Sequence, residues 1–277
     1  MSRSRPVPAR WRTAWRTVAR TLIGAALPRT FVLWAGPSAL DGTPVMVVAS
    51  GVSEPSENGK TGDMIQLAIM RADMAPIDAW ARGLDGAVCP AACAHRSKSR
   101  GGSGTCYVNK ARLSETWAAA RRAVDAGRVG YRPGMFKGAR VRFGMEGDPA
   151  AVPLAVWAPI LADAGAAHTG YTAAWRSLPV EWSRYFMASC GTPADALRAR
   201  SAGWRVFAAS SSATDDSAYV AAGLTLCEAE RPTPSACVDC LQCNGARPND
   251  ARPGRYLPMH GAVGAAVRKR NDKRATV

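Results

Sequence analysis

The sequence predicts an α/β protein whose parallel sheet is open or curled into a partial barrel, followed by a cysteine-rich segment. Two observations predict the sheet. Over residues 64–209, short apolar segments suited to buried strands alternate with segments that carry helix start and stop signals. At 277 residues, the chain is also long enough to bury a core of this kind. A third observation concerns the C-terminal part, where four of the eight cysteines fall within a short stretch and indicate a metal site.

Five short segments are the expected strands. The clearest is MIQLAIM at residues 64–70, because an apolar run of this length suits a strand that is buried on both faces. The others lie at residues 140–143, 167–172, 185–189 and 204–208. Parallel sheets carry their binding groups in the loops at the carboxyl ends of the strands. We therefore expect functional side chains in the loops that follow these runs.

Three helices are expected between the strands, at residues 114–127, 153–165 and 192–203. Ser114 can cap the first helix, and Pro153 suits the first turn of the second, in which Pro159 predicts a kink. Thr192 and the acidic Asp195 that follows it form a capping box at the start of the third helix. Each of the three segments ends at a glycine, as helix C-termini favour.

The net charge of +15 is concentrated at the two ends of the chain. Residues 1–30 contain seven arginines and no acidic residue, and residues 265–277 contain five basic residues against one acidic residue. Basic ends can bind the phosphates of nucleic acids or can be solvated tails, and the sequence leaves both readings open. The chain thus divides into a basic extension and linker (1–57), an α/β partial barrel (58–215), a cysteine-rich segment (216–262) and a basic tail (263–277).

The sequence shows no membrane-spanning or secretory signal. No run approaches the roughly 18 apolar residues that a bilayer crossing needs, and the first thirty residues lack an uninterrupted apolar region. We therefore expect a cytoplasmic protein without a transmembrane segment. Residues 9–27 have the spacing of an amphipathic helix, which would lie on an anionic membrane or dock on a partner. In a reducing compartment, grouped cysteines are interpreted as metal ligands before disulfides.

The strongest indication of function is the segment CEAERPTPSACVDCLQCNG, which contains Cys227, Cys237, Cys240 and Cys243. Four thiolates from one short loop can surround Zn2+ or hold a [4Fe–4S] cluster. The C-x-x-C-x-x-C spacing of the last three is similar to part of the bacterial ferredoxin pattern, whereas zinc ribbons usually have paired C-x-x-C knuckles. The spacing favours iron–sulfur slightly and leaves zinc open.

A second group, Cys89, Cys93 and Cys106, lies in the loop CPAACAHRSKSRGGSGTC, which follows the first expected strand. Three thiolates on an iron–sulfur cluster leave one iron open to a substrate or cofactor. With His95 added, the same residues would form a Cys3His zinc site. The eighth cysteine, Cys190, stands alone and is expected to be buried and inert.

The first elements follow one another as strand, cysteine loop with C-x-x-x-C, helix, strand and the turn GMEGDP at residues 144–149. This order resembles the start of a radical SAM barrel. The resemblance implies that the first cysteine group holds a [4Fe–4S] cluster and that the turn contacts the methionyl amine of S-adenosylmethionine. The cofactor-binding residues would then be Gly144, Glu146, Gly147 and Asp148. The chain departs from the family pattern in the loop, where twelve residues separate the second and third cysteines and the family has two.

A longer resemblance spans about residues 58–262. It rests on NGKTGDMIQLAIMRAD (58–73), GTCYVN (104–109), GDPAAVP (147–153), HTGYTAAW (168–175), MASCGTPADALRARSAGWRVF (187–207) and CVDCLQCNG (237–245). These stretches resemble an uncharacterised family encoded by phages, prophages and plasmids. Its members look like distant relatives of radical SAM proteins with an added C-terminal cysteine cluster. By this analogy, the C-terminal cysteines would hold an auxiliary cluster.

These observations favour an iron–sulfur protein of phage or mobile-element origin, acting on an unknown substrate. As an enzyme, it would cleave S-adenosylmethionine reductively and generate a radical on that substrate. The alternative is a zinc-stabilised nucleic-acid-binding protein in phage or plasmid replication or regulation, with its basic ends as clamps. A hydrolase triad is not expected, since the chain has three histidines and His168 is interpreted as a core histidine.

Overall fold

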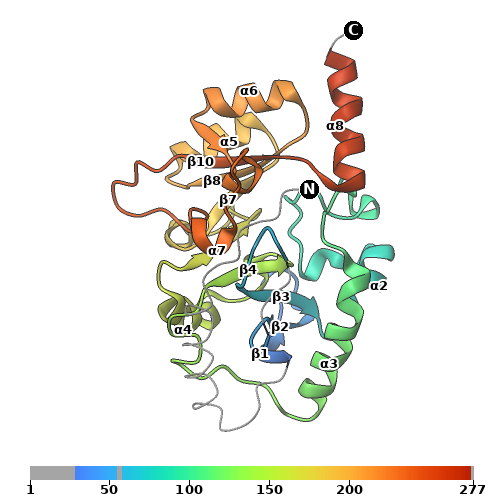
Figure 1. Ribbon diagram of the computed structural model, residues 1–277. Coiled ribbons are helices and arrows are strands. Elements are labelled where there is room, and N and C mark those ends of the chain that lie inside the picture. The colour runs from blue at the N-terminus through green and yellow to red at the C-terminus, as the bar shows by residue number, and fades with distance from the viewer. Residues whose placement is uncertain (1–28, 55–57, 276–277) are drawn as a thin grey trace.

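The computed structural model describes residues 29–54 and 58–275, and its strands form two five-stranded sheets (Figure 1). The first sheet has the order β1-β2-β3-β4-β5, with β1 Thr30–Pro37, β2 Pro44–Ser50, β3 Ile65–Arg71, β4 Val141–Glu146 and β5 His168–Thr169. The second has the order β6-β7-β8-β10-β9, with β6 Tyr171–Thr172, β7 Met187–Cys190, β8 Val206–Ser210, β9 Leu224–Leu226 and β10 Gly254–Pro258. All neighbours from β3 onward are parallel, which confirms the α/β class.

Helices cover both faces of the first sheet and pack beside the second (Figure 1). They are α2 Pro76–Ala81, α3 Ser114–Asp125, α4 Leu154–Ala164, α5 Pro193–Ser201, α6 Ala213–Ala221, α7 Cys237–Cys240 and α8 Gly261–Ala275. Residues of α3 pack with Met46 and Val48 of β2, whereas residues of α4 pack with Val45 and Val47. This alternation is what a strand with both faces buried requires.

Two helix starts differ in how well the sequence predicted them. Thr192 caps α5 as expected, because its hydroxyl accepts a hydrogen bond from the Asp195 amide at 3.1 Å. The expected cap at Ser114 is wrong, since Ser114 is already the first residue of α3. A 3-10 turn at Lys110–Leu113 leads into α3 without a break, and the Asn109 side chain caps that turn instead.

One extended segment, residues 168–172, joins the two sheets. Its first half is β5, which pairs with β4, and its second half is β6, which pairs with β7 on the other side. Gly170 lies between the halves, and its amide donates to the Cys243 carbonyl at 3.0 Å while its carbonyl accepts from the Met187 amide at 3.0 Å. The parallel strands from β3 to β9 therefore form one connected series.

A side chain at this junction should destabilise the fold. A Cβ on Gly170 would lie 2.6 Å from a ring carbon of Phe186, which is fully buried. We expect Gly170→Ala to lower the free energy of unfolding by about 1–3 kcal/mol, measured by urea denaturation. Gly59→Ala is the control, because a Cβ there meets no atom within 4 Å. Equal urea midpoints for the two variants would contradict the tight junction.

Residues 30–50, which the sequence analysis assigned to a basic extension and linker, belong to the first sheet. They form β1 and β2, which pair antiparallel with each other and with β3. A hairpin needs no crossover helix, so the alternation of strands and helices on which the prediction depended could not reveal it. The expected helix at residues 9–27 lies outside the described residues.

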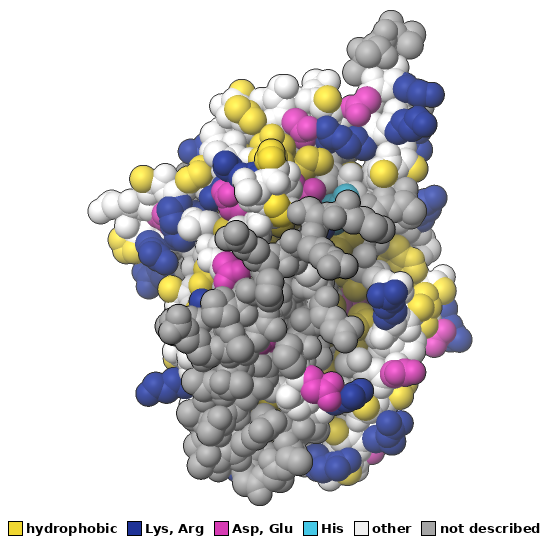
Figure 2. All heavy atoms as spheres, viewed as in Figure 1, with side chains coloured by type: hydrophobic (Ala, Val, Ile, Leu, Met, Phe, Trp, Pro, Cys, Tyr) yellow, Lys and Arg dark blue, Asp and Glu magenta, His cyan; other side chains and the backbone are white. Residues whose placement is uncertain are grey.

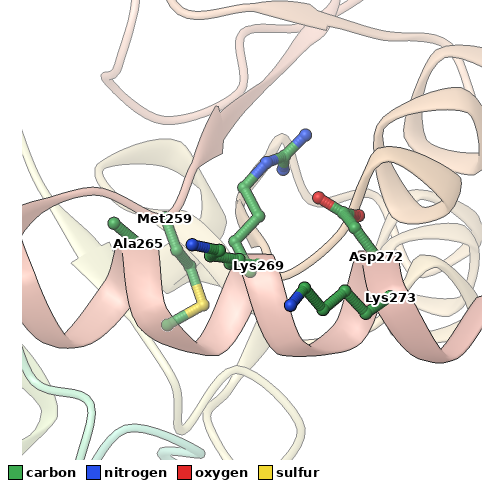
Figure 3. A pocket seen from close by; sticks show the side chains of 6 residues that line it. Met259, Ala265, Lys269, Asp272 and Lys273 are labelled. Atoms are coloured by element: carbon green, nitrogen blue, oxygen red, sulfur yellow. The ribbon is translucent and has the colours of Figure 1, made fainter.

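The C-terminal helix α8 projects from the body of the molecule, and Lys and Arg side chains gather on it (Figures 1 and 2). A hollow of ≈ 540 Å³ lies along it, lined by Met259, Asp272 and three basic side chains (Figure 3). The guanidinium of Arg268 pairs with Asp216 on α6, which anchors the helix. Within the described part of the chain, neither α8 nor any other helix has the length and apolar character of a membrane span.

Candidate metal centres and the cavity beside them

The first cysteine group lies in the loop that follows β3, where the twelve-residue excursion folds back on itself. The amide of Ser103 donates to Ala94 at 2.8 Å, and the amide of Cys106 donates to His95 at 3.0 Å. Burial raises the pKa of Cys89 well above its usual range, and the Glu146 carboxylate and the thiols of the other two cysteines raise it further. Such influences weaken with distance, so the fold brings these three sulfur atoms near one another.

A buried ion pair lies against this group. The ammonium of Lys110 lies 2.8 and 2.9 Å from the two carboxylate oxygens of Glu146, and the side chains are only 5% and 4% exposed. The same ammonium lies 3.7 Å from the Cys106 sulfur and 4.7 Å from the centre of the Trp80 ring. Although burial lowers the pKa of Lys110, the Glu146 carboxylate and the Cys106 and Cys89 thiols together raise it above its usual range, so the ammonium stays charged. No pattern in the sequence pointed to Lys110.

The residues of the turn after β4 make their contacts with other parts of this chain. Gly147 has a φ of +76°, and a Cβ there would lie 2.6 Å from the Ile69 carbonyl, so this position needs glycine. Gly144 also has a positive φ, of +66°. The Asp148 carboxylate accepts from the amides of Ala150 at 2.9 Å and Ala173 at 2.7 Å, although burial raises its pKa. Asp148 thus caps the following turn, and Glu146 already holds an ammonium from this chain where the resemblance expects the methionyl amine.

The C-terminal cysteines lie near one another as well. Burial raises the pKa of Cys243 to about 12, and the three other thiols of the group (Cys227, Cys237 and Cys240) also raise it. The hydroxyl of Tyr171 donates to the Cys243 sulfur and opposes this shift. The structure therefore brings together the four cysteines that the spacing had grouped.

Two anchors hold this segment against the amino ends of the parallel strands. The amides of Cys237 and Val238 donate to the carbonyls of Lys60 and Thr61, at 2.9 and 3.0 Å, just before β3. Arg205, just before β8 and 5% exposed, donates to the carbonyls of Gln242, Asn244 and Pro253 at 2.6, 2.9 and 2.9 Å. Three carbonyl partners fix the backbone around Cys243, and nothing in the sequence distinguishes this arginine.

Neither group is arranged around one metal ion. Among residues 29–54 and 58–275, no three side chains of His, Cys, Asp or Glu lie close enough to hold a single ion. Zinc needs sulfur atoms about 2.3 Å from one centre. A [4Fe–4S] cluster attaches each thiolate to a different iron, so its ligands are spread more widely. The His95 Nδ1 lies 2.7 Å from the Thr105 hydroxyl, so Nε2 is the nitrogen that a Cys3His site would use.

A cavity of ≈ 100 Å³ adjoins both groups. The strands of the second sheet contribute Tyr171, Ser189, Phe207, Ala209 and Leu257. The first cysteine loop contributes Thr105 and Tyr107, the neighbours of Cys106, and Tyr171 is the residue that donates to Cys243. One small cavity therefore has residues beside the first group in one wall and a hydrogen-bond partner of the second group in another.

Arg142 of β4 lies between the same two groups. Its guanidinium donates to the Tyr107 hydroxyl at 2.8 Å. Although burial lowers the pKa of Arg142, the side chains of Tyr107, Tyr171 and Cys237 raise it more. A cation is thus fixed between the cavity and the C-terminal cysteines, where it would favour negative charge on them.

Two residues that the sequence set aside are buried as expected. Cys190 is 2% exposed and belongs to neither group. His168 is 5% exposed, with Nδ1 2.6 Å from the Gly165 carbonyl and Nε2 2.8 Å from the Tyr185 carbonyl. Both ring nitrogens are used in the core, so this histidine has no part in the cavity.

His168 should make the fold sensitive to mild acid. Burial outweighs the two carbonyl contacts and lowers the pKa of His168 below its ordinary 6.5. The unfolded chain then takes up the proton first, so stability is complete above pH 6.5 and falls as the pH decreases. Urea unfolding at about pH 7.5 and about pH 5.5 should show a smaller loss for His168→Gln than for the natural chain. Equal losses of unfolding free energy in the variant and the natural chain would show that His168 is not the group that makes the fold sensitive to acid.

Comparison of the chain with family models, curated proteins and solved structures finds no match. Its function is therefore inferred from the two cysteine groups and from the cavity, whose lining includes neighbours of the first group and a hydrogen-bond partner of the second.

Proposed function

We propose that this chain is an iron–sulfur protein with a radical-SAM-like partial barrel. Cys89, Cys93 and Cys106 would hold one [4Fe–4S] cluster, and the C-terminal group (Cys227, Cys237, Cys240 and Cys243) would hold a second. The observation that carries the proposal is that the thiols within each group influence one another, while one cavity is lined by the neighbours of Cys106 and by Tyr171, which donates to Cys243.

Within the described residues, the sulfur atoms of neither group are set around one position, as a single zinc ion would need. In each group the thiols influence one another electrostatically, yet no three ligands within the described residues suit one ion. Burial also raises the pKa of the Cys93 and Cys237 thiols, and at Cys237 it outweighs the opposing effect of Arg142, so both thiols stay neutral unless further positive charge lies beside them. A cluster core supplies that positive charge and spans wider gaps than a single ion.

The residues of the chain have distinct parts in this arrangement. When bound, a cluster with three thiolate ligands supplies an open iron and one-electron transfer to whatever binds there. Lys110 places a fixed positive charge 3.7 Å from the Cys106 sulfur, and Tyr171 donates a hydrogen bond to the Cys243 sulfur. Both interactions stabilise negative charge on ligand sulfur. S-adenosylmethionine would have to compete with Lys110 for the Glu146 carboxylate, and its role stays a prediction.

Anaerobic purification tests the proposal. We expect brown protein that absorbs near about 400 nm and contains iron and acid-labile sulfide. Colourless protein that contains zinc and no iron would contradict it and favour a zinc-stabilised protein.

A second candidate function, nucleic-acid binding, is favoured by α8, which projects from the body and carries exposed basic side chains. Lys269 and Arg270 are both exposed. If they neutralise phosphates, Lys269→Glu with Arg270→Glu should reduce the slope of log affinity against log salt by about 2. An unchanged slope in a duplex-binding assay would remove α8 from any such role.

A further inference from the structure

The cavity beside the cysteine groups is lined by rings. Tyr107 and His260 stack with their ring centres 6.4 Å apart, and Tyr171 and Phe207 lie against each other at 4.2 Å. Tyr107 is 61% exposed although it lines the cavity, so a bound molecule would bury ring surface that water now covers. Aromatic faces of this kind bind flat rings by stacking.

The lining also restricts the charge of a ligand. No Lys, Arg, Asp or Glu is among the described side chains that line the cavity. A neighbouring cation, Arg142, is already bonded to the Tyr107 hydroxyl. Because moving an unpaired charge out of water is costly, the cavity selects a neutral molecule.

Two polar side chains in the cavity wall can form hydrogen bonds with the edge of a flat ring. The Ser189 hydroxyl has no hydrogen-bond partner among the described residues, although its neighbours in the wall are apolar or aromatic. His95 bonds to Thr105 through Nδ1 and keeps Nε2 for another partner. A hydroxyl and an imidazole can each donate or accept, which suits the mixed edge of a heteroaromatic ring.

The volume of the cavity limits the size of the molecule that it can bind. At ≈ 100 Å³ the cavity is smaller than the engineered cavity of about 150 Å³ that holds one benzene molecule. A single small ring, partly open to solvent, is the largest group that it accepts without rearrangement.

We propose that the cavity binds one neutral heteroaromatic ring, stacked on its aromatic wall and hydrogen-bonded at its edge to Ser189 and His95. Calling that ring part of a substrate rests on the proposed function. The binding itself does not, since it depends only on the cavity lining.

The test is binding of uracil to the full-length, anaerobically purified protein, measured by saturation-transfer NMR and calorimetry. Two matched probes test the need for an aromatic ring and for a neutral charge separately. Dihydrouracil keeps the polar edge but is not aromatic, and orotate keeps the ring but adds a carboxylate. We expect uracil to bind and both other probes to bind more weakly. Dihydrouracil or orotate binding as tightly as uracil, or no binding of uracil, would overturn the proposal.

Variants locate the site. Ser189→Ala should weaken uracil binding by a factor of about 2 to 10, the value of one hydrogen bond, and Ser189→Leu should abolish it by filling the cavity. Ser201→Ala, on the exposed surface of α5, is the control and should bind as the natural chain does. Binding unchanged in Ser189→Leu, with its fold verified by circular dichroism, would refute the site. If protein without iron binds uracil, this inference is supported and the proposed function is contradicted. If the protein contains iron but does not bind uracil, the proposed function is supported and this inference is contradicted.

Discussion

Replacing Cys243 with alanine should remove about half of the iron and acid-labile sulfide from anaerobically purified protein. Cys243 is buried, and its sulfur accepts the Tyr171 hydroxyl and lies among the other three thiols of its group. Since metal coordination energy is folding energy, the variant should also unfold at a lower temperature. The first cysteine group, which belongs to a separate loop after β3, should keep its cluster.

Cys190→Ala is the matched control for this experiment. Cys190 is as buried as Cys243, and burial raises its pKa to about 12, but it lies outside both groups. Its loss should leave a small cavity and the full iron content. Equal iron loss in the two variants, or full iron in Cys243→Ala, would contradict the assignment of the second cluster.

Replacing Lys110 with methionine should destabilise the protein by about 3–5 kcal/mol, because it leaves the Glu146 carboxylate buried without a counter-charge. That carboxylate is 4% exposed, and Lys110 contacts both of its oxygens. Anaerobic urea unfolding measures the loss. Arg198→Met, which removes an exposed partner 3.6 Å from Asp195, should cost less than about 1 kcal/mol.

The double variant Lys110→Met with Glu146→Gln separates charge from packing. With both charges gone, most of the lost stability should return, since two neutral groups of similar shape need no counter-charge. A double variant no more stable than Lys110→Met, or a single variant no worse than Arg198→Met, would show that the pair is not a significant part of the fold.

The strands that pair in parallel were the predictable part of the fold. Buried parallel strands are apolar runs, so β3, β4, β7 and β8 lie within a few residues of the segments at 64–70, 140–143, 185–189 and 204–208. The segment at 167–172 was found as one strand, but its break at Gly170 was not. That break depends on Phe186 and Cys243, which contact it only in the folded chain.

The candidate site likewise has residues that the sequence could predict and residues that it could not. Cysteine spacing predicted both groups, because ligands of one centre are few in type and close in sequence. Lys110, Arg142 and Arg205 were not predicted, since each acts through partners that the fold brings from elsewhere: Glu146 for the first, Tyr107 for the second, and carbonyls of the cysteine segment for the third. The sequence contains 36 lysines and arginines, and no local pattern separates these three.

The central claim, two iron–sulfur centres beside one cavity, is tested most directly by electron paramagnetic resonance of the reduced, anaerobic protein. Residues next to Cys106 and the hydrogen-bond partner of Cys243 line the same ≈ 100 Å³ space, so two reduced clusters would interact magnetically. We predict that the spectrum of the natural chain differs from the sum of the spectra of Cys93→Ala and Cys243→Ala. A spectrum equal to that sum, or protein without any iron signal, would contradict the claim.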